Sequence, residues 1–212
     1  MLKHHGFNLW ADSYDDTVKN TEKSNQYPFA GYTQLMNAIY GTIITRNPTN
    51  ILDIGFGTAL LTSRFYKAGI KVTGIDFSIE MIKIAQEKMP QANLLHWDFT
   101  KGLPTSLSKQ SFDFIISTYA LHHLDDKEKV RFITLLLDLL KPSGSILIGD
   151  IGFQTREELL HCKNNNQDSW DKDEIYFVYD ELHQALQTKC KLTYHPFSFC
   201  CGVIEIKKLN CK

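Results

Sequence analysis

The chain has 212 residues, of which 43% are hydrophobic and 22% are charged. This composition is that of one globular domain with a modest insertion, and it excludes collagen-like, disordered and disulfide-scaffold proteins. Because 23 Lys and Arg stand against 24 Asp and Glu, for a net charge of −1, no basic field dominates and we expect no nucleic-acid partner. No apolar run approaches the roughly 18 residues of a membrane span, so we expect no membrane partner.

The five cysteines and the N-terminus bear on the compartment. The cysteines form no C-x-x-C pair, and the adjacent Cys200 and Cys201 cannot form an unstrained disulfide. The first residues lack the apolar core of a secretory signal. These features predict a cytoplasmic protein with reduced thiols.

Residues 1–48 are predicted to form a helical cap before the first strand. Trp10 and Tyr14 mark a candidate helical face, and a second helix is predicted over residues 28–44. From residue 50, short apolar runs alternate with helical patterns, which is typical of βα units and a parallel sheet.

The remaining elements complete a predicted α/β fold. The predicted strands are 50–54, 71–75, 93–97, 112–118, 145–150, 192–199 and 203–207. The predicted helices are 59–67, 78–88, 126–140, 155–161 and 180–188. Because the connection between the last two strands is too short for a parallel crossover, they should form an antiparallel hairpin. We therefore expect one domain, with a Rossmann-like, seven-stranded, mostly parallel sheet that has helices on both faces. Residues 49–150 would be its ligand-binding core, and residues 151–212 would add insert helices and the closing hairpin.

An acidic residue stands near the end of each of three successive predicted strands: Asp53, Asp76 and Asp98. Gly55 and Gly57 follow the first of them, and glycine permits both a sharp turn and the close approach of a ligand. Open α/β sheets bind ligands at the carboxyl ends of their strands, so these carboxylates are predicted to meet at a binding site. The alternatives are a glycine turn kept for packing and an aspartate that only caps the next helix.

The pattern favours one class of ligand over another. A carboxylate at the end of the second strand suits a ribose diol. The dinucleotide fingerprint, however, requires a glycine where the chain has Leu60, and no phosphate-binding P-loop occurs. A ligand with a ribose, an adenine and a net positive part would suit three aspartates better than a pyrophosphate would.

In their order and spacing, these segments resemble the motifs of the class I S-adenosylmethionine-dependent methyltransferases. The resemblance covers roughly residues 45–150 and rests on segments 53–59, 76–77, 98–99, 112–117 and 139–144. The opening segment 10–15 is similar to the N-terminal helix of many small-molecule members, and the chain more weakly resembles the small bacterial YrrT-like group. One departure is Ala59, where the family has its third glycine, and one added methyl is readily tolerated there.

The resemblance implies S-adenosylmethionine as the cofactor and S-adenosylhomocysteine as the product. The implied cofactor-binding residues are Asp53, Gly55, Gly57, Asp76, Phe77, Asp98, Phe99 and Ser117. The first three would face the methionine part, with Asp53 at its ammonium. Asp76 would hold the ribose diol. Phe77, Asp98 and Phe99 would lie around the adenine, and Ser117 would lie beside the reacting methyl.

Methyl transfer from a sulfonium is an in-line displacement with a neutral leaving group, so alignment and desolvation can carry it. A general base is needed only if the acceptor loses a proton, and residues just after the fourth strand are the candidates for it. The candidate catalytic residues are His123 and Tyr119, and the candidate acceptor-pocket residues are Tyr14, Tyr32, Tyr119 and His122. Packing or capping is the alternative for each. Residues 153–180 would form a lid or specificity insert.

The acceptor is predicted to be a small molecule. The segment from Ser117 to Ala120 lacks the paired prolines of amino-methylating nucleic-acid enzymes, and no cysteine follows a proline as cytosine-C5 enzymes require. The adjacent histidine pairs lack the i, i+4 spacing of a typical two-histidine metal site, so we expect no metal. Two rival hypotheses are a non-catalytic module that binds the same cofactor and a nicotinamide-dependent oxidoreductase, which Leu60 disfavours.

Overall fold

The computed structural model describes residues 25–209 of the chain. The strands are β1 (Asn50–Ile54), β2 (Lys71–Asp76), β3 (Asn93–His96), β4 (Phe112–Thr118), β5 (Leu140–Phe153), β6 (Phe177–Val178), β7 (Cys190–Pro196) and β8 (Cys201–Lys208). The helices are α2 (Tyr32–Ile44), α3 (Thr62–Lys67), α4 (Ile79–Lys88), α5 (Asp126–Leu139), α6 (Arg156–Asn165) and α7 (Tyr179–Leu186), with 3-10 turns η1 (Phe99–Lys101), η2 (Thr105–Leu107) and η3 (Leu121–His123). The candidate helix around Trp10 and Tyr14 lies outside the described residues.

The sheet has the strand order β3-β2-β1-β4-β5-β8-β7. The first five strands are parallel, and β8 runs antiparallel to both β5 and β7. The predicted seven-stranded, mostly parallel sheet with a closing hairpin is therefore confirmed. The two-residue strand β6 pairs with the end of β5 outside this path and is too short to have a sequence pattern.

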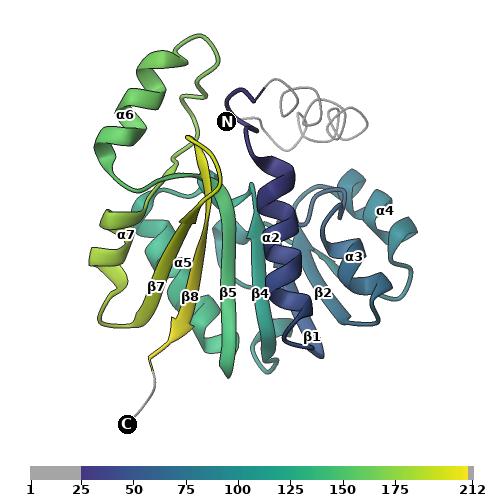
Figure 1. Ribbon diagram of the computed structural model, residues 1–212. Coiled ribbons are helices and arrows are strands. Elements are labelled where there is room, and N and C mark those ends of the chain that lie inside the picture. The colour runs from purple at the N-terminus through teal and green to yellow at the C-terminus, as the bar shows by residue number, and fades with distance from the viewer. Residues whose placement is uncertain (1–24, 210–212) are drawn as a thin grey trace.

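Two hydrophobic layers cover the two faces of the sheet (Figure 1). Successive side chains of a strand point to opposite faces, so Ile51 packs with α2 and α3 while Leu52 packs with α5 and α7. In α2, Ile39 and Ile43 are almost completely buried against the sheet. Burying one such side chain stabilises the fold by roughly 1.5–3 kcal/mol, so this apolar stripe holds α2 in place.

Local backbone chemistry moves several predicted boundaries. The helix predicted over 59–67 begins only at Thr62, because Ala59 has a φ of +60° and cannot belong to a right-handed helix. The helix predicted over 28–44 begins at Tyr32, after Gly31 with a φ of +79°. Pro142 and Gly144 should stop the helix before them, and α5 does end at Leu139. The chain then enters β5 directly rather than a loop.

The start of α5 is held by a reciprocal cap. The Asp125 carboxylate accepts from the backbone N–H of Glu128 at 2.7 Å, and the Glu128 carboxylate accepts from the Asp125 N–H at 2.8 Å. This capping box satisfies two backbone N–H donors at the helix terminus, so α5 can begin shortly after η3.

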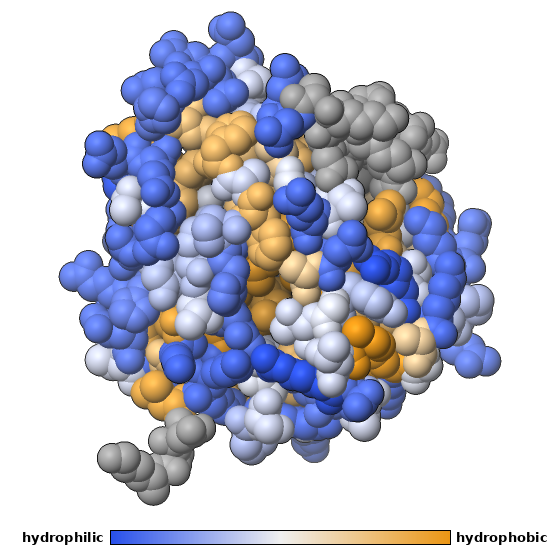
Figure 2. All heavy atoms as spheres, viewed as in Figure 1, coloured by the Kyte–Doolittle hydropathy of each residue, from blue (hydrophilic) through white to orange (hydrophobic). Residues whose placement is uncertain are grey.

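Hydrophilic side chains predominate on the face seen in Figure 2, and hydrophobic ones come to the surface in several smaller, separate areas. No helix among residues 25–209 is both long and apolar enough to cross a bilayer.

Candidate functional site

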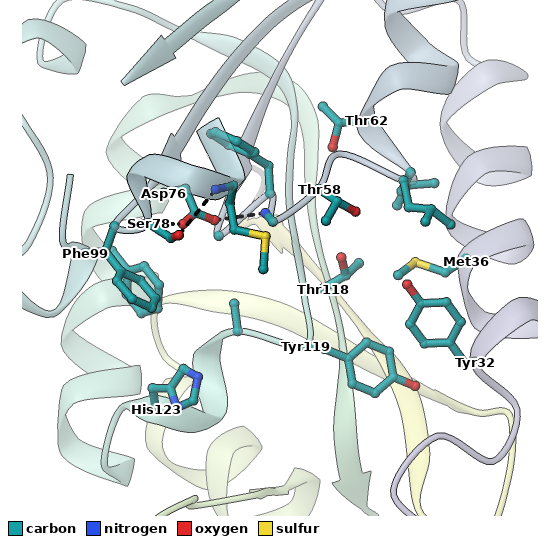
Figure 3. Close-up of a pocket in the computed structure, with 18 residues that line it drawn as sticks. Tyr32, Met36, Thr58, Thr62, Asp76, Ser78, Phe99, Thr118, Tyr119 and His123 are labelled. Atoms are coloured by element: carbon teal, nitrogen blue, oxygen red, sulfur yellow. Dashed lines mark hydrogen bonds between the residues drawn. The ribbon is translucent and has the colours of Figure 1, made fainter. Parts of the chain in front are cut away.

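A cleft opens at the carboxyl ends of β1, β2 and β4, beside the first turn of α2 (Figure 3). The structure brings eight sequence-predicted site residues into its lining: Tyr32, Gly55, Gly57, Asp76, Phe77, Phe99, Tyr119 and His123. These residues come from segments up to 91 positions apart (123 − 32), and the parallel sheet gathers them at one edge. The position is the one where open α/β sheets bind ligands.

The glycine turn after β1 forms the floor of the cleft. Gly55 has a φ of +71°, and a Cβ at this position would lie 2.6 Å from the Cβ of Ala120, which is closer than atoms can approach. Gly57 has a φ of +54°, and a Cβ there would meet no atom of residues 25–209 within 4 Å. Gly55 is thus required by close packing, whereas Gly57 faces open space in which a ligand can lie against the backbone.

Asp76 joins this turn to the start of α4. Its Oδ2 accepts from the Gly57 N–H at 2.8 Å and its Oδ1 accepts from the Ser78 N–H at 2.8 Å. Burial raises the pKa of Asp76, and the backbone N–H groups that it accepts from oppose that rise. Each carboxylate oxygen can accept a further hydrogen bond. The group is therefore already oriented for a pair of hydroxyls.

Asp53 lies beneath the turn and is only 1% exposed. Its Oδ2 accepts from the hydroxyl of Thr62, while its Oδ1 is buried with no hydrogen-bond partner among the described residues. Burial raises the pKa of Asp53 to about 7, the Thr62 hydroxyl opposes this rise, and the nearby Asp76 adds to it. A buried carboxylate that lacks a donor fits a cationic group, because an ammonium would supply both the charge and the hydrogen bond.

Three predicted cofactor residues lie outside the cleft lining: Asp53, described above, Asp98 and Ser117. The Asp98 carboxylate accepts from the backbone N–H and the hydroxyl of Thr100 at 3.1 and 2.6 Å, and it thereby caps η1. Burial alone would raise the pKa of Asp98, but these bonds and Lys101 together lower it. Ser117 donates from its hydroxyl to the Ile54 carbonyl at 2.9 Å. Their proposed contacts with the cofactor remain predictions.

Aromatic side chains form the wall on the α2 side. Tyr119 directly follows β4 with a φ of +50°, a conformation that non-glycine residues adopt mainly at functional or strained positions. Its ring lies 5.1 Å from that of Tyr32 and 5.6 Å from that of Phe29, measured between centroids. Burial, reinforced by Cys201, raises the pKa of the Tyr119 phenol well above its ordinary value, so it stays protonated. Tyr14, also predicted for this pocket, lies outside the described residues.

The two adjacent histidines have different environments. His123 lines the cleft, and burial together with its neighbour His122 lowers its pKa to about 4, so its imidazole is neutral at pH 7. His122 lies behind the cleft, with Nδ1 at 2.7 Å from Asp150 Oδ1 and Nε2 at 3.4 Å from Glu174 Oε1. Burial alone would lower the pKa of His122, but the two carboxylates raise it. His122 was predicted to line the acceptor pocket, but it is not part of the cleft lining.

Ten further residues of the cleft were missed by the sequence analysis: Met36, Phe56, Thr58, Leu60, Leu61, Thr62, Ser78, Met81, Thr118 and Ala120. Five of them directly neighbour a predicted residue in the chain, and Leu60, Leu61 and Thr62 follow Gly57 by three to five positions, so a wider window around each motif would have included these eight. Met36 and Met81 carry no such signal, because only the packing of α2 and α4 decides which helical positions face the cleft.

The chain is similar to known methyltransferases. A family model described as a methyltransferase domain matches residues 51–144. An uncharacterized methyltransferase of Oceanobacillus iheyensis is 30% identical over 204 residues, which cover 96% of this chain and 91% of that protein. The uncharacterized methyltransferase YrrT of Halobacillus halophilus is 32% identical over 210 residues, which cover 95% of each chain.

Solved structures share the fold at low sequence identity. The DhpI–SAH complex is similar with a TM-score of 0.68 and 15% identity, over 97% of this chain and 94% of that one. A S-adenosylmethionine-dependent methyltransferase of Clostridium acetobutylicum has a TM-score of 0.69 and 13% identity, over 93% and 99% of the two chains. Since the curated relatives match along nearly the whole chain, the protein belongs to the class I S-adenosylmethionine-dependent methyltransferases and, within them, resembles the YrrT-like group.

Proposed function

We propose that the protein transfers the methyl group of S-adenosylmethionine to a small-molecule acceptor by in-line displacement. The observation that carries the proposal is the pair of buried carboxylates, Asp53 and Asp76, beneath an open glycine turn. Asp53 Oδ1 lacks a donor among the described residues and Asp76 lines the cleft, as a ligand with both an ammonium and a ribose diol requires.

In this proposal, different residues bind different parts of the cofactor. Asp53 would hold the ammonium of the cofactor, Asp76 would accept from the ribose hydroxyls, and Phe77 and Phe99 would pack against the adenine. The bound cofactor supplies an electrophilic methyl group. Tyr32 and Tyr119 would exclude water from the region where the acceptor meets that methyl, which strengthens alignment and desolvation.

His123 is the candidate general base. Its imidazole is neutral at pH 7 and lines the cleft, so it can accept a proton from an acceptor that must lose one. Because its lowered pKa makes it a weak base, it would serve an acceptor whose acidity rises as the methyl bond forms. Tyr119 stays protonated and would act as a hydrogen-bond donor or by packing.

The shape of the cleft favours a small acceptor. Tyr32 and Met36 of α2 line one side of it (Figure 3). A long polymer would need a continuous groove across the molecule, whereas this cleft ends at α2.

Calorimetric titration with S-adenosylhomocysteine tests the proposal. The wild-type protein should bind one equivalent, and Asp76→Ala should weaken binding by roughly 10- to 100-fold, the range for a hydrogen bond to a charged group. Asp138→Ala on the exposed side of α5 is the matched control and should bind like wild type. Because Asp76 also holds two backbone N–H groups, circular dichroism must show that the variant is folded. No saturable binding by folded wild-type protein would refute the proposal, and binding without methyl transfer to any of a broad acceptor panel would favour the non-catalytic module.

A further inference from the structure

Three side chains of metal-ligand type meet beside the cleft, from two distant segments. His122 and His123 lie on η3, and Glu174 lies in the connection between α6 and β6. One ligand atom from each residue can be chosen so that all three lie within 4.8 Å of one another. His122 Nε2 and Glu174 Oε1 are 3.4 Å apart, close to the roughly 3.3 Å that separates two ligands of a tetrahedral ion with bonds of about 2.0–2.1 Å.

The outer partner of His122 determines where its lone pair points. Asp150 Oδ1 lies 2.7 Å from His122 Nδ1, so a neutral imidazole donates its proton to Asp150 and presents the lone pair of Nε2 to the carboxylate of Glu174. Nε2 and Oε1 at this distance are held together either by a proton on Nε2 or by a metal cation in its place. A carboxylate that orients a histidine in this way is the usual second partner of a metal-bound imidazole.

Glu174 is held in position by contacts of its own. The Tyr176 hydroxyl donates to Glu174 Oε2 at 2.8 Å, which leaves Oε1 toward His122. The next residue, Ile175, donates its N–H to the His122 carbonyl at 2.8 Å and accepts from Lys129 Nζ at 2.5 Å. These bonds join the connection to η3 and α5, so the donor set exists before any ligand arrives.

The charge of this region also calls for a cation. Asp150 is 2% exposed, and its Oδ2 has no hydrogen-bond partner among the described residues. Glu174 adds a second, largely buried carboxylate within reach of the same imidazole. The Lys129 ammonium, whose charge also acts on His122, is held by the Ile175 carbonyl and by Asp126. A divalent ion would compensate both carboxylates.

We propose that His122, His123 and Glu174 form a binding site for a divalent transition-metal ion such as Zn²⁺. Two imidazoles and one carboxylate are a donor set that suits Zn²⁺ and neighbouring ions, and three protein ligands leave one coordination position open. The histidine spacing alone predicted no metal, because the third ligand lies 51 residues further along the chain (174 − 123).

His123 also lines the cleft, so the open position lies at the edge of the proposed acceptor site. An oxygen, nitrogen or sulfur atom of the acceptor could bind there and be held as an anion. With the ion bound, the lone pair of His123 is taken up by the metal, so the ion would replace His123 as the group that promotes loss of the acceptor's proton. This second role, unlike metal binding itself, rests on the proposed function.

Titration of the metal-free full-length protein with Zn²⁺ by calorimetry, and with Co²⁺ by its visible absorption, tests the site. We expect one tight equivalent, weakened at least tenfold in Glu174→Gln and in His123→Gln. The matched controls are Glu157→Gln and His161→Gln on exposed positions of α6, which should bind like wild type. Both test variants keep a polar side chain of similar size, and circular dichroism verifies their folding.

Absence of binding by folded wild type, or binding that neither test variant weakens, would overturn the proposal and leave a proton as the cation between His122 and Glu174. The S-adenosylhomocysteine titration is made on the same samples. Metal binding without cofactor binding would refute only the proposed function, and cofactor binding without metal binding would refute only the metal site.

Discussion

Cofactor affinity should depend on pH through the carboxyl group of Asp53. This group is buried, its pKa is raised to about 7, and one of its oxygens has no donor. An ammonium placed beside it would favour the ionised form and lower that pKa, so binding below pH 7 must release a proton. Affinity for S-adenosylhomocysteine should therefore fall as the pH drops through 7, and it should be about tenfold weaker at pH 6 than at pH 8.

Asp53→Asn isolates this effect. The amide oxygen can still accept from Thr62, but the charge and its titration are gone. At pH 8 the variant should bind roughly 10- to 100-fold more weakly than wild type, and at pH 6 this difference should be about tenfold smaller. Asp138→Asn, on the exposed face of α5, should leave the pH profile unchanged.

The same carboxyl group should affect the stability of the unliganded protein in the opposite direction. A raised folded-state pKa means that the folded protein binds more protons than the unfolded chain between about pH 4 and pH 7. The contribution of Asp53 to the free energy of unfolding therefore decreases as the pH rises through this window. Asp53→Asn should lack that decrease, and thermal melts at pH 5 and pH 8 would show it.

Calorimetry between pH 6 and pH 8, in buffers of different ionisation enthalpy, measures both the affinity and the protons released. Wild-type affinity that does not change with pH, with no proton release, would refute the reasoning. So would an Asp53→Asn variant that retains the wild-type slope, because the titrating group would then lie elsewhere.

Three further predictions concern the turn, the α5 cap and catalysis. Gly55→Ala should destabilise the protein by about 1–3 kcal/mol in denaturant melts, because its Cβ would overlap that of Ala120. Gly57→Ala has open space around its Cβ and should cost only the roughly 1 kcal/mol of a left-handed φ. Equal effects of the two substitutions would contradict this assignment. Asp125→Ala should lower stability by about 0.5–2 kcal/mol through loss of the capping box, and an unchanged melting temperature would show that the cap is dispensable. Once an acceptor is identified, His123→Gln should reduce kcat by about 10²- to 10⁴-fold with S-adenosylhomocysteine affinity unchanged, and an unaltered kcat would rule out its role as a base.

Much of the fold followed from local chemistry. The alternation of Ile51 and Leu52 between two helical layers, and the capping residues of α5, act over a few positions and can be recognised in the chain. The strand-end aspartates and the glycine turn predicted the place of the cleft, because parallel strands bring their carboxyl ends to one edge.

Other features depend on contacts between distant segments. Ala59 takes a left-handed conformation that delays α3, although nothing in its own side chain favours one. Met36 and Met81 face the cleft because their helices pack at particular angles to the sheet, which no local pattern specifies.

The sequence by itself determined the α/β class, the C-terminal antiparallel hairpin and the aspartates at the ends of the parallel strands, since those features follow from periodicity and spacing. Only the tertiary structure decided the state of these groups. Burial leaves one oxygen of Asp53 without a donor, and it brings Glu174 to His122 across 52 residues (174 − 122). Both depend on how completely water is excluded and on which distant segment packs there, and neither quantity is encoded in any short stretch of the chain.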